Sequence, residues 1–178
     1  MTHQIIMAGF GGQGVMSMGR ILAEAGLKEG KNVSWLPSYG PEMRGGTANC
    51  SVIISDEPVG APTVTEATAA IVMNRPSLDK FEKDVLPGGH LFINSSLIDR
   101  KATREDINVY YIPANEIADE LGTGKIANMV MLGAYIKVTN AAKEETIMEY
   151  IEEIFSGKKA ELIPLNKEAL KRGADCIK

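Results

Sequence analysis

The chain has 178 residues, a length that suits one domain of ordinary size with a substantial hydrophobic core. Hydrophobic residues make up 44% of the sequence and charged residues 24%, a composition typical of globular proteins. The net charge is −4 and no basic run or stripe occurs, so the sequence argues against nucleic acid as a partner.

Cysteine usage and hydropathy exclude two further classes of function. The two cysteines, Cys50 and Cys176, lie far apart and form no CxxC pair, so this chain alone offers neither a zinc site nor the ligands of an iron–sulfur cluster. No apolar run approaches the ~18 residues of a membrane span, and the first residues lack the charged start of a secretion signal. We therefore expect a cytoplasmic protein that binds neither a metal nor a membrane.

The first part of the chain predicts a strand–helix–strand unit. Residues 4–8 (QIIMA) form an apolar run typical of a short buried strand, and a glycine-rich turn follows at 9–14. Residues 15–29 have apolar side chains at helical spacing, and 32–36 (NVSWL) again resembles a strand. Two strands joined through a covering helix are expected to be parallel.

The later elements continue this alternation. Further strands are expected at 47–55, 69–74, 90–94 and 108–112, and helices at 75–85, 125–138, 144–155 and 165–177, with the Pro-Gly-Gly at 87–89 ending the first of these helices. No internal repeat or long linker divides the chain. We therefore predict a single domain over residues 1–178 with an α/β fold, a three-layer α/β/α sandwich around a Rossmann-like, mostly parallel sheet.

The turn at residues 9–14 (GFGGQG) matches half of the dinucleotide-binding fingerprint. In the pattern G-x-G-x-x-G, Gly9 would permit the tight turn, Gly11 the close approach of a ligand, and Gly14 the close packing of helix on strand. The fingerprint also needs a carboxylate at the end of the second strand, but that strand ends at Leu36 and the nearest acid is Glu42. Three interpretations stay open: a nicotinamide dinucleotide, another anion or cofactor, or glycines that only let the turn or a second polypeptide pack closely.

A second stiff loop, PSYGPEMRGG at residues 37–46, follows the carboxyl end of the strand at 32–36. Its prolines and glycines exclude a regular element, and it carries Tyr39, Glu42 and Arg44. Glu42 and Arg44 either contact a ligand or pair with each other. Because both loops leave the same edge of the sheet, where open α/β sheets bind ligands, we expect one composite surface.

Groups that could move protons are scarce near these loops. His3 and His90 are the only histidines, and each begins a predicted strand, at the end opposite the glycine loop. No Ser/His/Asp or Cys/His grouping occurs, so we assign no catalytic residue. The helix at 125–138 is apolar nearly all round; it belongs either at the centre of the fold or under a partner, and a homodimer could cover it in the isolated chain. We interpret the chain as a subunit whose site is completed by other chains.

Several stretches resemble the gamma subunit of 2-oxoacid:ferredoxin oxidoreductases, the pyruvate/ketoisovalerate oxidoreductase gamma family. They are GFGGQGV at 9–15, PSYGPEMRGGTANC at 37–50, NRPSLDKFE at 74–82 and GGHLFINSSLI at 88–98, and the second is the most specific. The sequence of this second stretch is most similar to gamma subunits of the 2-oxoglutarate type. The resemblance implies that the characteristic residues of these loops bind a cofactor or contact another subunit. They are Gly9, Gly11, Gly12, Gly14, Ser38, Tyr39, Pro41, Glu42, Arg44, Gly45 and Gly46.

This resemblance implies a function that residue spacing does not. Such enzymes oxidatively decarboxylate a 2-oxoacid, here expected to be 2-oxoglutarate, with coenzyme A, giving acyl-CoA, carbon dioxide and reduced ferredoxin. Branched-chain 2-oxoacids and indolepyruvate stay open as substrates. The resemblance also implies thiamine diphosphate and iron–sulfur clusters in the partner alpha, beta and ferredoxin-like delta subunits, with no cofactor bound by this chain alone.

The alternative from another class is a stand-alone Rossmann-type oxidoreductase that binds NAD(P), or a nucleotide-sensing module. The carboxylate missing after residue 36 disfavours a dinucleotide in either case.

Overall fold

The computed structural model describes residues 1–38 and 48–178. Its strands are β1 (Thr2–Gly9), β2 (Asn32–Ser38), β3 (Ala48–Ser55), β4 (Ala67–Val72), β5 (Val85–Asn94) and β6 (Asn108–Ile112). Its helices are α1 (Val15–Lys28), α2 (Arg75–Phe81), α3 (Ala114–Glu120), α4 (Ala127–Thr139), α5 (Glu144–Ile154) and α6 (Leu162–Asp175), with short 3-10 turns between some of them.

The strands form one six-stranded sheet in the order β2-β3-β1-β4-β5-β6. The pairs β1–β4, β4–β5 and β5–β6 are parallel, as predicted, but β3 runs antiparallel between β2 and β1. The strand–helix–strand unit is therefore present, yet its two strands are not neighbours. A hairpin between β2 and β3 brings the chain back, and hydrophobic periodicity carries no information on which strand enters the gap.

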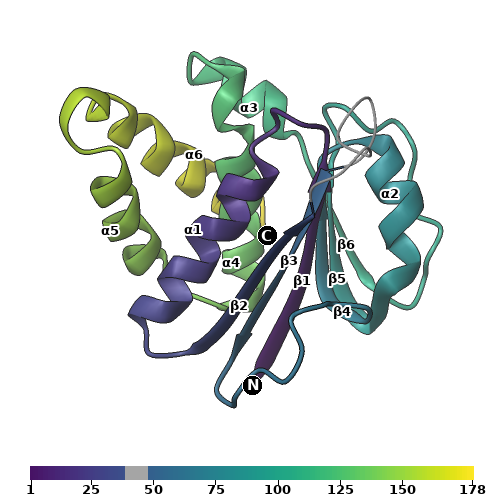
Figure 1. Cartoon of the computed structure of the whole chain (residues 1–178). Coiled ribbons are helices and arrows are strands. Elements are labelled where there is room, and N and C mark those ends of the chain that lie inside the picture. Colours follow the sequence, from purple (N-terminus) through teal and green to yellow (C-terminus); the bar gives the residue numbers. More distant parts are fainter. Residues whose placement is uncertain (39–47) are drawn as a thin grey trace.

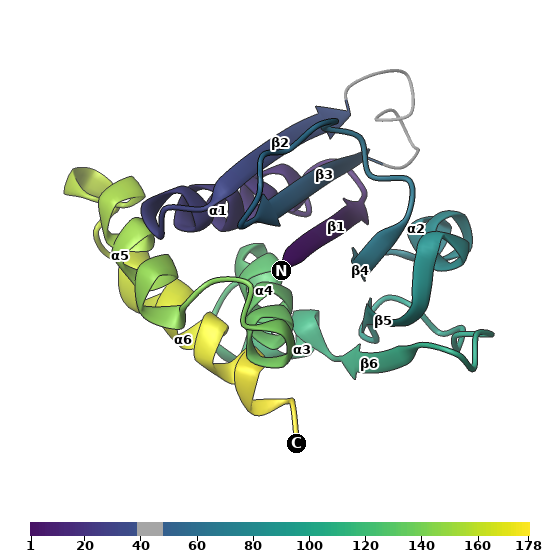
Figure 2. The same ribbon diagram turned by 90° about the horizontal axis from the view of Figure 1, so that it is seen from below.

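Helices cover both faces of the sheet unequally, which confirms the three-layer α/β/α prediction. Figures 1 and 2 show α1 and α3–α6 on one face and α2 alone on the other. The alternation along β1 supplies both cores, because Ile5 and Met7 pack among α1 and the C-terminal helices while Ile6 and Ala8 pack beneath α2. The α1 layer holds the larger cluster.

The helix predicted to be apolar all round lies at the centre of the fold. In α4, every residue from Ala127 to Ile136 is buried. Helix α6 approaches α4 so closely that a Cβ at Gly133 would lie 2.0 Å from the Leu170 carbonyl oxygen, and a Cβ at Gly173 would lie 1.8 Å from that of Val130. The chain itself covers α4, so this helix gives no reason to expect a homodimer.

Two elements differ from the sequence prediction. Residues 87–89 do not end a helix but belong to β5, where Gly88 has a φ of +81° and the register with β4 shifts between Ala67 and Ala69. The bulge accommodates a Pro-Gly-Gly that a regular central strand would exclude. Helix α3 was not predicted, because only Ala114, Ile117 and Ala118 of its seven residues are buried and the apolar pattern is short.

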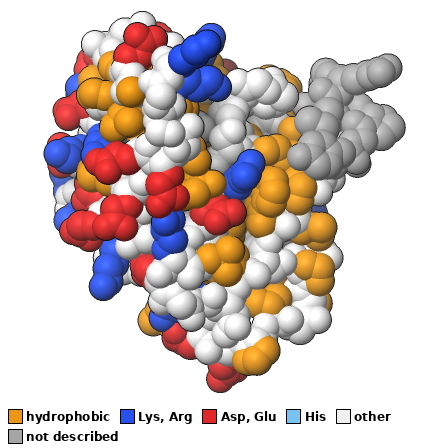
Figure 3. Space-filling model, turned by 60° about the vertical axis from the view of Figure 1, so that its left-hand side comes forward, with side chains coloured by type: hydrophobic (Ala, Val, Ile, Leu, Met, Phe, Trp, Pro, Cys, Tyr) orange, Lys and Arg blue, Asp and Glu red, His pale blue; other side chains and the backbone are white. Residues whose placement is uncertain are grey.

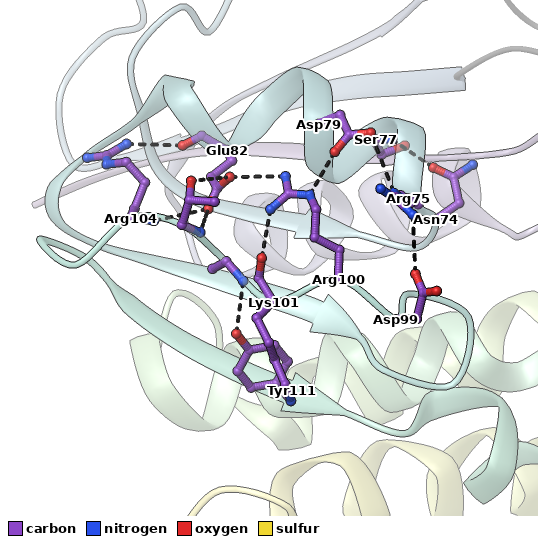
Figure 4. Close-up of polar contacts among 12 residues, drawn as sticks. Asn74, Arg75, Ser77, Asp79, Glu82, Asp99, Arg100, Lys101, Arg104 and Tyr111 are labelled. Carbon is purple, nitrogen blue, oxygen red and sulfur yellow. Dashed lines mark hydrogen bonds and ion pairs between the residues drawn. The ribbon is translucent and has the colours of Figure 1, made fainter.

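A buried carboxylate ties the turn after α2 to the segment between β5 and β6 (Figure 4). Glu82 is 6% exposed, and its carboxylate accepts hydrogen bonds from the Thr103 backbone N–H at 2.6 Å and from Arg100 Nη2 at 3.1 Å. Arg100 also donates to Asp79 at 2.8 Å, and the Arg104 guanidinium donates to the Glu82 carbonyl at 3.0 Å. These charge-assisted bonds satisfy the buried carboxylate and fix a long connection against the sheet.

Candidate functional site

The glycine loop forms a closed turn between β1 and α1. The Gln13 N–H donates to the Phe10 carbonyl at 3.2 Å, and Gly12, the third residue of this turn, has a φ of +90°, as a type II turn requires. The Gln13 side chain folds back so that its Oε1 accepts from the Phe10 N–H at 2.6 Å. The loop is therefore braced from inside by its own glutamine.

The structure reassigns two of the roles predicted for the glycines. The positive φ values that a tight turn needs belong to Gly12 and to Gly14 (φ +74°), not to Gly9. Gly9 instead serves close packing, because a Cβ there would lie 2.6 Å from Gln13 Oε1 and 2.9 Å from Met73 Cβ. Gly11 and Gly12 are exposed, as expected of positions that a ligand or a second chain could approach.

A residue that the sequence did not single out holds this loop against α4. Asn128 is 7% exposed, and its Nδ2 donates to the Gly14 carbonyl at 3.1 Å. The same carbonyl oxygen also accepts a hydrogen bond from the Met18 N–H at 2.9 Å, so it accepts two hydrogen bonds at the start of α1. A Cβ at Gly14 would lie 2.5 Å from Asn128 Nδ2. The one available signal was an asparagine near the start of an otherwise apolar helix.

The two predicted loops leave the same edge of the sheet. Gly9 pairs with Ala48 and Ser38 pairs with Asn49, so the end of β2, the start of β3 and the glycine loop lie side by side at that edge. The rest of the second loop falls outside the described residues, namely Tyr39, Pro41, Glu42, Arg44, Gly45 and Gly46. Within the described part of β2, no carboxylate stands at the strand end to bind a ribose.

Asparagines stand at or just after the carboxyl ends of the neighbouring strands β4 and β5, and the sequence reasoning gave them no role. Asn94 is fully buried, and its Nδ2 donates to the Met73 carbonyl at 3.3 Å and to Asn115 Oδ1 at 2.8 Å. Asn74 Oδ1 accepts the Ser77 N–H at 3.0 Å, which caps α2. Among the described residues, the buried Asn74 Nδ2 has no hydrogen-bond partner.

A groove of about 550 Å³ opens beside the glycine loop, on the face of the molecule that α1 and the C-terminal helices occupy. We call it the helix-side groove. Gly12 and Gly14 form part of its wall, and Arg20, Lys125 and Lys159 supply its charges. The sequence reasoning missed it because its walls come from four helices and three turns that are distant along the chain.

The two histidines lie at the other edge of the sheet, as predicted. His3 and His90 line a separate cavity of about 380 Å³, together with Thr68 near the amino end of β4 and Gly89 in β5. Burial lowers the pKa of both imidazoles below its usual value. The lowered pKa favours the neutral form of both rings, and their cavity lies at the edge of the sheet opposite the glycine loop.

The cysteines do not suit a metal centre. The Cys50 thiol is buried and donates to the Val15 carbonyl at 3.7 Å, and burial raises its pKa to about 12. Across residues 1–38 and 48–178, no three His, Cys, Asp or Glu side chains are grouped so as to hold a metal ion.

Among the helices described, none combines the length and the apolar character needed to cross a membrane.

Comparisons with known proteins give the chain its family. Residues 4–176 match the family model described as pyruvate ferredoxin/flavodoxin oxidoreductase. The ketoisovalerate oxidoreductase subunit VorA of Methanothermobacter marburgensis is 43% identical over 173 residues, which cover 97% of this chain and 36% of VorA. The chain therefore spans about a third of that relative's length.

Two solved structures share the fold along nearly the whole chain. The gamma subunit of a keto/oxoacid ferredoxin oxidoreductase from Geobacter sulfurreducens matches with a TM-score of 0.83 and 29% identity, covering 98% of this chain and 97% of that one. The 2-oxoglutarate:ferredoxin oxidoreductase of Magnetococcus marinus, solved with 2-oxoglutarate, coenzyme A and succinyl-CoA bound, matches with a TM-score of 0.90 and 25% identity over 98% of this chain and 31% of that chain. The chain therefore belongs to the pyruvate ferredoxin/flavodoxin oxidoreductase family, as a member of the gamma-subunit type.

Proposed function

We propose that this chain works as the gamma subunit of a complex that oxidatively decarboxylates a 2-oxoacid. The complex transfers the acyl group to coenzyme A, releases carbon dioxide and passes the electrons to ferredoxin. The observation that carries the proposal is the end-to-end correspondence with a gamma subunit that is itself a separate chain. The proposal treats residues 1–178 as one gamma-subunit domain.

The substrate is proposed as a class. The sequence resemblance favours 2-oxoglutarate, the substrate named for the Magnetococcus marinus enzyme, whereas the VorA relative is named for ketoisovalerate. Both compounds are 2-oxoacids, and they differ in the side chain beyond the oxo group. We assign the choice between them to the partner chains.

We assign the edge that carries the glycine loop to contact with a partner subunit, close to where coenzyme A or thiamine diphosphate is handled. Phe10 at the loop tip is 41% exposed and Leu36 near the end of β2 is 40% exposed. Figure 3 shows hydrophobic side chains gathered on this side of the molecule. Exposed apolar groups at such an edge favour burial against another chain.

The residues proposed for this role are those of the two loops: Gly9, Gly11, Gly12, Gly14 and Ser38 within the described residues, and Tyr39, Pro41, Glu42, Arg44, Gly45 and Gly46 outside them.

Cofactors and partners follow from the same proposal. Thiamine diphosphate and iron–sulfur clusters are assigned to the alpha, beta and ferredoxin-like delta subunits, and coenzyme A is the co-substrate. The described cysteines do not fit a cluster, since Cys50 is buried inside the fold. The cytoplasmic location stays a prediction from the sequence, whereas the reason for expecting a homodimer is removed by the burial of α4 within the chain.

The rival, a stand-alone oxidoreductase or sensor that binds NAD(P), is disfavoured by the loop itself. Gln13 Oε1 already occupies the Phe10 N–H, one of the donors that a pyrophosphate would use, and the described end of β2 lacks the ribose-binding acid. A thermal-shift screen separates the two. Our proposal expects no rise in Tm with NAD(H) or NADP(H), and a clear rise with either would reverse this ranking.

The proposed function is tested by anaerobic purification of the chain from its native host. We expect the chain to co-purify with chains that carry thiamine diphosphate and iron–sulfur clusters. The assembly should reduce ferredoxin with a 2-oxoacid and coenzyme A, and separate assays with 2-oxoglutarate and ketoisovalerate identify the substrate. Recovery of a monomer with nicotinamide-dependent activity of its own would contradict the proposal.

A further inference from the structure

Phe10, at the tip of the glycine loop, lies largely outside the core of the fold. It is 41% exposed and belongs to neither hydrophobic cluster of the described residues, whereas Phe81, Phe92 and Phe155 pack in or against those clusters. Single exposed apolar side chains are common on protein surfaces, so exposure alone does not make Phe10 a binding residue. The construction of its loop supplies the further evidence.

One residue holds both polar groups of the Phe10 main chain. The Phe10 N–H donates to Gln13 Oε1 at 2.6 Å, and the Phe10 carbonyl accepts the Gln13 N–H at 3.2 Å. This brace requires a glycine at position 9, because a Cβ at Gly9 would lie 2.6 Å from Gln13 Oε1. At the other end of the loop, Asn128 Nδ2 donates to the Gly14 carbonyl. The loop is therefore ordered before it meets a partner, which lowers the entropic cost of binding.

The residues after Phe10 leave room for another polypeptide beside the ring. Gly11 and Gly12 are both exposed, and a Cβ at Gly12 would have nothing within 4 Å among the described residues. A second chain can therefore approach the main chain of this turn closely while the ring enters a pocket. Aromatic side chains that fill desolvated pockets are enriched among the residues that dominate binding at protein interfaces.

The chemistry of the loop tip narrows the kind of pocket. None of residues 9–14 carries a charge, and the phenyl ring has no polar atom. Leu36, which is 40% exposed, adds apolar surface on β2 at the same edge of the sheet. An apolar pocket therefore matches Phe10, whereas a charged or strongly hydrated one does not.

We infer that Phe10 is the anchor through which the glycine loop docks into an apolar pocket of a partner subunit, and that Gln13 is the positioning residue that holds this anchor. The identity of the partner, a chain of the 2-oxoacid complex, rests on the proposed function. The exposure of the ring and the bracing of its main chain are properties of this chain alone.

Binding of the full chain to its partners tests the anchor. The probe is the subcomplex of partner chains, purified anaerobically without this chain, and the measurement is the Kd by biolayer interferometry. We expect F10A to weaken binding roughly thirtyfold or more, as removal of an interface anchor does. The control is L27A, because Leu27 is 54% exposed but lies near the far end of α1, roughly 18 Å along the helix from its start. Wild-type affinity in F10A, or equal losses in F10A and L27A, would overturn the inference.

The variant Q13A tests the positioning role. It should weaken binding by about three- to tenfold, because the loop must then be ordered on binding. If Gln13 acts through Phe10, Q13A should add nothing to the loss in the double variant F10A/Q13A. Additive losses would show that Gln13 contacts the partner itself and would overturn the positioning role.

Hydrogen exchange of the isolated chain tests the brace without any partner. The Phe10 amide should exchange roughly fivefold faster in Q13A than in the wild type, because it loses its acceptor. An unchanged rate would overturn the brace. Thermal unfolding of each variant checks that the fold is retained.

Activity of the assembled complex separates this inference from the proposed function. A wild-type assembly that forms but does not reduce ferredoxin with a 2-oxoacid and coenzyme A would refute the proposed function, while the affinities of F10A and L27A would still decide the anchor. An active complex that binds F10A as tightly as the wild type would refute the anchor and leave the proposed function standing.

Discussion

The carboxamide of Asn128 donates a hydrogen bond to the carbonyl of Gly14 at 3.1 Å and joins two segments that are 114 residues apart in sequence. Replacing Asn128 with alanine should lower the free energy of unfolding by about 1–2 kcal/mol, because the partly buried Gly14 carbonyl loses one of its two donors. Urea denaturation of the full chain measures this. A loss below the error of the measurement would mean that the contact contributes nothing to the loop.

Gly14 itself gives a sharper test of the same contact. G14A should destabilise the chain by about 2 kcal/mol or more, since the new methyl group meets Asn128 Nδ2 and the backbone must hold a φ of +74°. G12A is the matched control, because Gly12 has a φ of +90° but nothing within 4 Å of its Cβ position. The double variant G14A/N128A should be more stable than the sum of the single losses predicts. Strict additivity would refute the steric contact.

Glu82 should make the free energy of unfolding depend on pH. Burial opposes its ionisation, but hydrogen bonds from Thr103, Arg100 and Arg104 outweigh this effect and hold the pKa of the carboxyl below its usual value. The stability that it contributes is therefore complete above the pKa of an unfolded glutamate and is lost as the pH falls through the lower folded pKa.

The variant E82Q should lose roughly 2–4 kcal/mol near pH 7, because a neutral amide leaves Arg100 without a buried counter-charge. The difference from the wild type should shrink in acid. Urea titrations between pH 7 and pH 3 measure both effects, and E116Q, at an exposed position in α3, is the control. A pH-independent difference would contradict the assignment.

The close approach of α4 and α6 should tolerate no side chain at its two glycines. G133A and G173A each place a methyl group about 2 Å from a backbone carbonyl oxygen of the other helix, so each should cost more than ~4 kcal/mol or prevent folding. G60A is the control, because Gly60 has open space around it. Circular dichroism and urea denaturation compare the three, and a stable G173A would show that the helices are further apart.

The two thiols should differ in reactivity. Cys50 is fully buried and its pKa is raised to about 12, whereas Cys176 is partly exposed. An aromatic disulfide reagent at pH 8 should label Cys176 in the folded chain and Cys50 only after denaturation. The variant C176A should therefore show almost no native labelling, and rapid labelling in that variant would place Cys50 at the surface.

The sequence predicted those features that depend on local pattern. The apolar runs of β1, β4 and β5 and the fully apolar α4 are periodic signals, and they located the sheet and the central helix. The glycine loop was recognised because a strand and a helix flank it directly. Its bracing by Gln13 and the true roles of Gly9 and Gly14 depend on φ angles and on contacts that the motif does not contain.

The rest depends on pairings between distant segments. The insertion of β3 between β1 and β2 follows from a hairpin whose register no pattern fixes. Asn128 acts on Gly14 only because α4 packs against the start of α1, and the helix-side groove is lined by Arg20, Lys125 and Lys159 from three separate parts of the chain. Tertiary packing, rather than local propensity, creates these sites.

The central claim is that this chain completes a site shared with other polypeptides and does not act alone. It is tested most directly by reconstitution of the complex with and without the chain, with ferredoxin reduction by a 2-oxoacid and coenzyme A as the measurement. The account predicts no activity for the isolated chain, little or none for the partners alone, and recovery when the chain is added back. Full activity of the partners without the chain, or turnover by the chain alone, would contradict it.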